Sequence, residues 1–250
     1  MKKQPVLMMN RLGTGHIITI FVYWIVSYMV LPSIRPFAVH GLWEDLKALS
    51  WIDMFCYALN AFTTAVIMKE HLSDAFFEVR YCPRTIIETV STAVMLMLLW
   101  VAVISIGAYC LLGELLIMID YVPVSEMAMT MTPGLLVETR PLIGTLCFTC
   151  LVPFTVCGFF YATGFAPLCC SRPWLAYLNT AFLLLIAAGI QAFWYKDTVI
   201  PMISYFLQLP IHLTACWSYQ RTDNIWAPVF SIGLLNLLSS VLFLVLCALG

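Results

Sequence analysis

The sequence has very little charge. Only 10% of its 250 residues are Asp, Glu, Lys or Arg, whereas a soluble domain carries about 25%. Because 62% of the residues are hydrophobic, a chain of this length cannot assemble a polar surface that faces water. The formal net charge of −1 gives no electrostatic basis for binding nucleic acid. The composition therefore excludes an ordinary soluble domain and indicates that lipid is the solvent.

Clusters of polar residues that could hold a metal or a redox centre are also lacking. Most of the ten cysteines lie in apolar runs, where cysteine acts as a small hydrophobic residue. Cys147 and Cys150 form a C-x-x-C pair, but they lie in the middle of such a run, far from further polar ligands. Metal ligands usually cluster, so we predict no metal and no other cofactor.

Long apolar runs are what the sequence does contain. A membrane-spanning helix needs about 20 predominantly apolar residues, and seven runs meet this requirement. They are residues 16–34, 50–68, 86–111, 141–166, 174–195, 199–219 and 225–249. The predicted fold is an all-α, polytopic transmembrane helix bundle with about seven spanning helices, in one integral membrane domain over residues 1–250. The loop 112–138 could hold an eighth membrane segment.

The basic residues predict which side of the membrane each loop occupies, because cytoplasmic loops are enriched in Lys and Arg. With the N-terminus inside, the inner segments hold Lys2, Lys3, Arg11, Lys69, Arg80, Arg84, Arg172 and Arg221. The outer segments then hold Arg35, Lys47, Arg140 and Lys196. This distribution favours a multi-pass protein with a cytoplasmic N-terminus and an outer C-terminus, and we expect it in a bacterial plasma membrane.

Residues 69–84, KEHLSDAFFEVRYCPR, separate the second and third predicted spans. They mix Phe76, Phe77 and Val79 with many charged side chains. This pattern is typical of an amphipathic helix that lies in the membrane interface. We therefore expect residues 69–84 to form a helix on the inner face of the membrane.

Few polar side chains fall inside the predicted spans, and each is a candidate functional residue because burying it in lipid is costly. His212 and Asn236 are the two that could form a residual polar site. Arg84 and Glu88 lie four residues apart, so they should form a helical ion pair near the inner surface. The other side chains are more typical of hydrogen bonds between helices: Asn60, Asn179 and Gln191.

The string RTDNIWAPVFSIGLLNLLSS, residues 221–240, resembles the last motif of the CPBP family of membrane proteins. That family comprises the CAAX proteases and bacteriocin-processing proteins, also called the abortive-infection family. The matching residues are Thr222, Ile225, Trp226, Ala227, Pro228, Leu235 and Asn236. Where the family places a catalytic His, this chain has Ile232, while the family's Asn, one helical turn later, is retained as Asn236.

The resemblance continues upstream, in residues 151–176. Aligned on Gly164, the family's paired glutamates fall at Gly158 and Phe159, and its Arg falls at Thr163. Aligned on Pro153 instead, the glutamates fall at Val156 and Cys157, so neither alignment supplies an acid. The family's second His falls at Ile186 or Ala188. The resemblance thus implies a four-helix CPBP-like core at 141–249, preceded by N-terminal helices at 1–111.

Members of this family are regarded as intramembrane metalloendopeptidases, so the resemblance implies a reaction that needs a base and ligands. Gly, Phe, Thr and Ile at the motif positions can supply neither. We therefore expect a non-catalytic homologue that binds membrane lipid or a membrane peptide or protein. Two alternatives stay open. One is an active endopeptidase with a substituted site around His212 and Asn236, which would need a carboxylate such as Glu88 or Glu138. The other is a transporter component.

Overall fold

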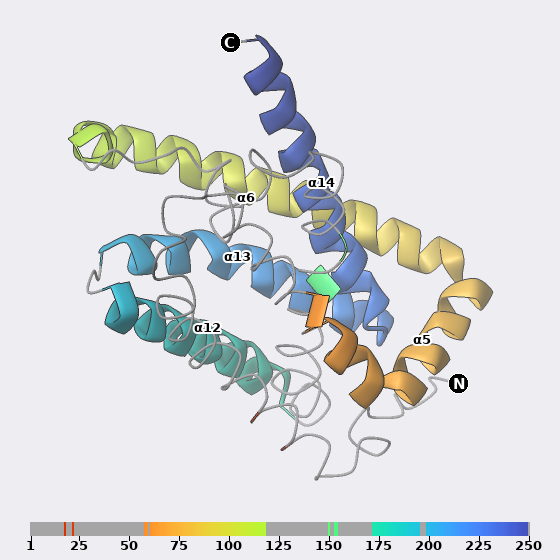
Figure 1. The fold of residues 1–250 in the computed structure, drawn as a ribbon. Helices are drawn as coiled ribbons and strands as arrows, with labels where there is room; N and C mark the ends of the chain where they lie inside the picture. Colours follow the sequence, from red (N-terminus) through yellow and green to blue (C-terminus); the bar gives the residue numbers. More distant parts are fainter. Residues whose placement is uncertain are drawn as a thin grey trace.

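The computed structural model describes part of the chain, and all helices named below lie in that part. The described residues are 18, 22, 58–59, 61–118, 150, 153–154, 172–195 and 199–249. The secondary-structure elements of this part are all helical (Figure 1), which is compatible with the all-α prediction. Most of the predicted spans 16–34 and 141–166 lies outside the described residues.

Five named helices form the described part of the fold. They are α5 (Lys69–Tyr81), α6 (Pro83–Met118), α12 (Pro173–Tyr195), α13 (Val199–Thr222) and α14 (Trp226–Leu249). The helices predicted at 174–195, 199–219 and 225–249 are confirmed to within three residues at each end. One boundary was wrong, because residues 112–118 were assigned to a loop and instead belong to α6. Their sequence, LGELLIM, is rich in good helix formers, which carry the helix past the predicted end.

Helix α5 is set off from its neighbours by two short breaks. Residues 61–67 are helical and Met68 is a turn, although the N–H of Leu72 still donates to the Met68 carbonyl at 2.9 Å. At the other end, Pro83 begins α6, a position where the missing N–H of proline costs no helical hydrogen bond. The apolar residues Leu72, Ala75 and Val79 of α5 are buried or half-buried, which gives the helix the expected two faces.

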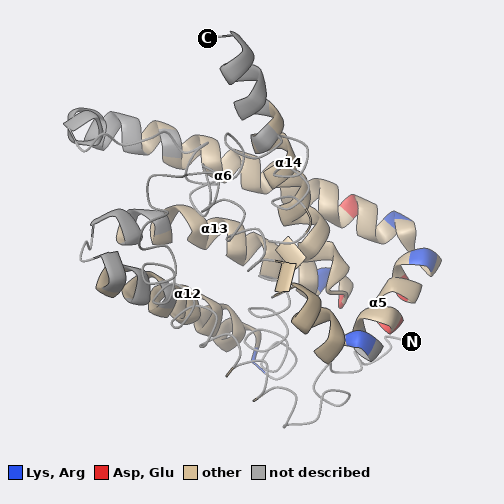
Figure 2. Cartoon of the chain, in the orientation of Figure 1, with Lys and Arg blue, Asp and Glu red and all other residues tan. Residues whose placement is uncertain are grey.

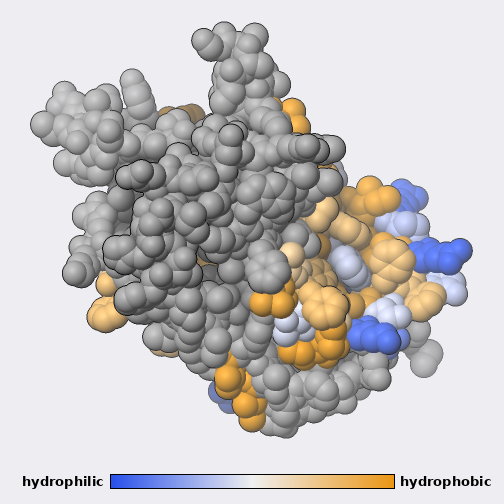
Figure 3. Space-filling view, viewed as in Figure 1, coloured by the Kyte–Doolittle hydropathy of each residue, from blue (hydrophilic) through white to orange (hydrophobic). Residues whose placement is uncertain are grey.

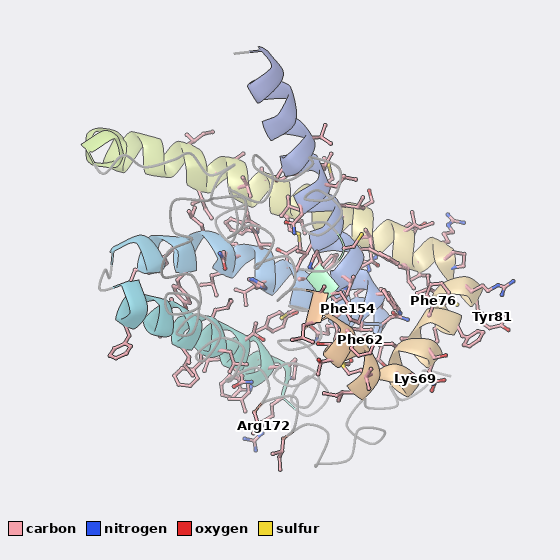
Figure 4. All side chains as sticks on the ribbon, in the orientation of Figure 1. Phe62, Lys69, Phe76, Tyr81, Phe154 and Arg172 are labelled. Carbon is pink, nitrogen blue, oxygen red and sulfur yellow. The ribbon has the colours of Figure 1, made fainter. Side chains whose placement is uncertain are left out.

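Three aromatic side chains of α5 are exposed. Phe76, Phe77 and Tyr81 are all exposed, and Figure 4 shows Tyr81 at the outer edge of the molecule. Aromatic side chains with this exposure are typical of the membrane–water interface. Figure 3 shows the same region as apolar surface with strongly hydrophilic side chains along its outer edge.

Helix α13 lies between α6 and α12, and α14 packs against both α6 and α13 (Figure 1). The apolar core sits among these four helices. Its fully buried members include small side chains, Ala176, Ala215 and Cys216, which let the helices approach closely. Helix α13 continues through Pro210, and the hydroxyl of Thr214 donates to the Pro210 carbonyl at 2.8 Å.

Within the described part, α6 holds the one stretch long and apolar enough to cross a membrane. It covers Pro83–Ile104, has a mean hydropathy of 2.1, and has only 33% of its residues buried. Figure 2 shows that charged residues lie along α5, at the start of α6 and around the end of α13. Shorter apolar stretches occupy Pro173–Ile186 and Trp226–Ser239.

Candidate binding site at the turn between α13 and α14

The turn that joins α13 to α14 begins with a residue in the left-handed region. Asp223 has a φ of 53°, a conformation that Asp and Asn adopt more readily than other residues with a side chain. Its N–H donates to the Tyr219 carbonyl at 2.7 Å, which satisfies a carbonyl at the end of α13. The chain can therefore reverse direction within three residues, 223–225.

Asn224 is the most deeply placed polar residue of this turn, with 1% of its surface exposed. Its Oδ1 accepts from the N–H of Trp226 at 2.9 Å, so it caps the start of α14. Its Nδ2 donates to the Ala75 carbonyl of α5 at 2.8 Å and lies 3.5 Å from Oε2 of Glu78. One side chain thus caps α14 and fastens α5 to it.

Trp226 makes a second connection between α14 and α5. Its Nε1 donates to the Leu72 carbonyl at 3.3 Å. Its ring meets Phe76 of α5 edge-on at 5.9 Å and stacks on Phe230 at 5.7 Å and Phe154 at 6.1 Å. Figure 4 labels Phe76 and Phe154, which approach the start of α14 from two different segments of the chain. We call Asn224, Trp226 and their α5 partners the α5–α14 junction.

Two carboxylates lie beside this junction, on Glu78 and Asp223. Partial removal of water from the Asp223 carboxyl, and then the charge of Glu78, raise the pKa of Asp223 to about 6. The residue as a whole is exposed, so solvent screens most of this effect. The Asp223 carboxyl therefore loses its proton as the pH rises through about 6, and the negative charge beside the junction increases.

The remaining motif residues stabilise the same turn. The Thr222 hydroxyl donates to the Ser218 carbonyl at 2.8 Å, and the Ala227 N–H donates to the Asn224 carbonyl at 3.2 Å. Pro228 lies in the first turn of α14, where its missing N–H needs no partner. Ile225 is almost fully buried in the core. The first five matching residues of the motif thus have a structural role at the turn between α13 and α14.

Ile232, at the position where the resemblance places the family's His, is the seventh residue of α14. It is 7% exposed and belongs to the apolar core formed with α6, α12 and α13. Asn236 is buried on α14, and His212 is buried on α13. Both make interactions within the protein, and their helices pack against each other. Among the described residues, Ile232 belongs to a cluster of buried apolar side chains.

The other predicted site positions are Gly158, Phe159 and Thr163, and all three lie outside the described residues. Glu138, one of the two carboxylates considered for a substituted site, lies outside them as well. The second, Glu88, pairs with Arg84 at 2.8 Å on the surface, with side chains 58% and 91% exposed. The predicted ion pair is confirmed. The side chain of Glu88 is exposed at the surface, whereas His212 is buried.

The described residues contain no group of three His, Cys, Asp or Glu side chains that could hold a metal ion. The amide of Asn224 and the indole N–H of Trp226 are both used in hydrogen bonds within the protein, so the junction is a structural connection between α5 and α14. Sequence reasoning missed Asn224. Its position directly before an apolar helix is a capping signal, whereas its bond to α5 carries no sequence signal.

Comparison with known proteins gave no relative: no family model, curated protein or solved structure matches the chain.

Proposed function

We propose that this chain is a multi-pass membrane protein built on a CPBP-like scaffold that binds a membrane partner and does not cleave peptides. The observation that carries the proposal is the surroundings of Ile232. At the position where the resemblance calls for a catalytic His, the chain packs an aliphatic side chain into an apolar core. Water activation needs a base, and the buried polar residues of the described chain include no carboxylate.

Two contacts support the multi-pass arrangement. The predicted orientation puts α5, the start of α12 and the end of α13 on the cytoplasmic side. Asn224 meets Ala75, and the Tyr177 hydroxyl donates to Gln220 Oε1 at 2.7 Å. Segments assigned to one side of the membrane are therefore in contact. The apolar stretch of α6, two-thirds of which is unburied, is consistent with a surface that faces lipid.

The non-catalytic role is tested with purified full-length protein in detergent. We expect less than one equivalent of zinc by elemental analysis and no cleavage of a prenylated peptide. The matched variants are His212→Ala and Ile232→His. One equivalent of zinc that disappears in His212→Ala would contradict the proposal and favour a substituted protease site. Cleavage by wild-type protein would do the same.

A further inference from the structure

An apolar groove of about 440 Å³ opens along one side of α6, next to the α5–α6 corner. Its wall is formed by the first turns of α6, by Val79 at the end of α5, and by Phe230 and Leu234 of α14. Ile86 and Val90 form its buried side. Ser91 is the one lining residue with a hydroxyl, so the groove is suited to hydrocarbon.

The groove has the length of one bilayer leaflet. Its α6 lining runs from Pro83 to Met95, which is about 18 Å of helix. The hydrocarbon core of a bilayer is about 30 Å thick, so one leaflet offers about 15 Å. If Pro83 lies at the cytoplasmic interface, as the multi-pass proposal requires, the groove reaches from the headgroup region to the middle of the membrane.

Positive charge lies at the interfacial end of the groove. Arg80 follows the lining residue Val79, and Arg84 follows the lining residue Pro83; both arginines are exposed. Arg84 also lies three and seven residues before Ile87 and Ser91, so it shares their side of the helix. Its surface pair with Glu88 is weak, which leaves the guanidinium able to bind a phosphate as well. The Glu78 carboxylate lies 3.5 Å from Nδ2 of Asn224.

We infer that this groove binds one acyl chain of an anionic phospholipid of the cytoplasmic leaflet, with the phosphate held by Arg80 and Arg84. The inference rests on the proposed membrane embedding and narrows the proposed partner to a lipid. The length of the groove selects a lipid chain, and the two arginines select a negative headgroup. Arg, with its fork of donors, is suited to phosphate.

The test is native mass spectrometry of the full chain released from mixed micelles of phosphatidylglycerol and phosphatidylcholine. We expect one retained lipid, with phosphatidylglycerol preferred about 25-fold, since each of the two basic residues near the headgroup favours an anionic lipid about fivefold. The double variant Arg80→Gln/Arg84→Gln should remove this preference, so that the two lipids are retained about equally. Arg84→Lys should keep most of the preference. Ser91→Phe, an exposed lining position, should lower the retention of both lipids.

Two variants serve as controls. Lys69→Gln removes one positive charge at the far end of α5, and Leu99→Phe enlarges an exposed side chain of α6 beyond the groove; neither should alter retention. Equal retention of the two lipids by the wild-type protein would overturn the inference, as would a preference that survives in the double glutamine variant or full occupancy in Ser91→Phe. These outcomes would contradict the lipid inference alone, because the zinc and cleavage assays test the proposed function separately. A chain that does not partition into membranes would overturn both proposals.

Discussion

The buried amide of Asn224 both caps α14 and bonds to α5. We therefore expect its substitution to lower the stability of the protein more than that of other polar residues in the described chain. Its substitution removes the cap of α14 and the bond to the Ala75 carbonyl at once. A lost cap costs about 1 kcal/mol, and a buried acceptor left without its partner, here the Ala75 carbonyl, costs about 1–3 kcal/mol. The two effects share one side chain, so they cannot be separated by a single change.

Asn224→Ala should therefore lower the free energy of unfolding by about 2–3 kcal/mol. It should also loosen α5, so that trypsin cleaves faster after Arg80. Both can be measured in detergent, by denaturant titration and by limited proteolysis. Ser73→Ala, on the exposed surface of the same helix, is the control. Wild-type stability in Asn224→Ala would show that the junction does not hold α5 in place.

Asp223 offers a second measurement, this time of pH dependence. Because its pKa is raised to about 6 in the folded protein, ionisation is less favourable there than in the unfolded chain. The wild-type protein should lose stability as the pH rises from about 4 through about 6. Asp223→Asn tolerates the left-handed conformation and does not titrate.

The stability of Asp223→Asn relative to wild type should thus increase between pH 5 and pH 7.5. The gain should be about 1 kcal/mol or less, since the residue is exposed and the interaction is screened. Unfolding measured at both pH values checks this. A difference between variant and wild type that does not change with pH would mean that Asp223 titrates normally.

At the scale of helices, the sequence predicted helix limits well where the apolar runs are long. The limits of α12, α13 and α14 follow from proline and polar residues at their ends. The end of α6 was misplaced because Gly113 and Glu114 resemble a loop, although their neighbours favour helix. Contacts between distant helices could not be predicted, since the packing of α5 against α14 joins segments 149 residues apart. No residue pattern within either segment encodes such a pairing.

Hydroxyl groups on these helices are satisfied locally. The side chains of Thr89, Thr180 and Ser231 each donate to the carbonyl four residues earlier, at 2.8–3.1 Å. A hydroxyl bonded in this way can be buried in an apolar bundle without a partner from another helix. These helices can therefore carry polar residues and still be compatible with lipid.

Cys82, exposed between α5 and α6, provides a test of the orientation of these two helices. In a variant that keeps Cys82 as its single cysteine, a membrane-impermeant maleimide should label inverted vesicles and leave intact cells unlabelled. Glu126→Cys, in a variant from which all ten native cysteines including Cys82 have been removed, should give the reverse result, because the loop is predicted to lie outside. Labelling of Cys82 from the outside of intact cells would reverse the predicted orientation.

On the scale of the whole molecule, the exposed surface of α6 is apolar. Large apolar side chains are exposed along α6, including Ile87, Met95, Leu99 and Val103. In water such a surface would promote aggregation, whereas lipid covers it without cost. The low charge of the sequence and the exposure of α6 therefore support the same conclusion, although they are independent observations.

The protein should accordingly stay in the membrane fraction through washes with high salt and with alkaline carbonate, and should be released only by detergent. A peripheral protein attached through the charges of α5 would be removed by salt, because such attraction is screened. Immunoblotting of the fractions distinguishes the two. Release by salt alone would contradict an integral membrane location.

The α5–α14 junction has a consequence for the order of biosynthesis. Its two sides are separated by 149 residues, so α5 leaves the ribosome long before Asn224 exists. Throughout that interval the carbonyls of Leu72 and Ala75 lack these partners, and the exposed aromatic side chains of α5 can rest on the lipid surface. The turn between α13 and α14 then binds to α5, which has already formed. In a nascent chain released before residue 224, α5 would lack its bonds to Asn224 and Trp226, and this unpaired α5 is a feature that cellular quality control could recognise.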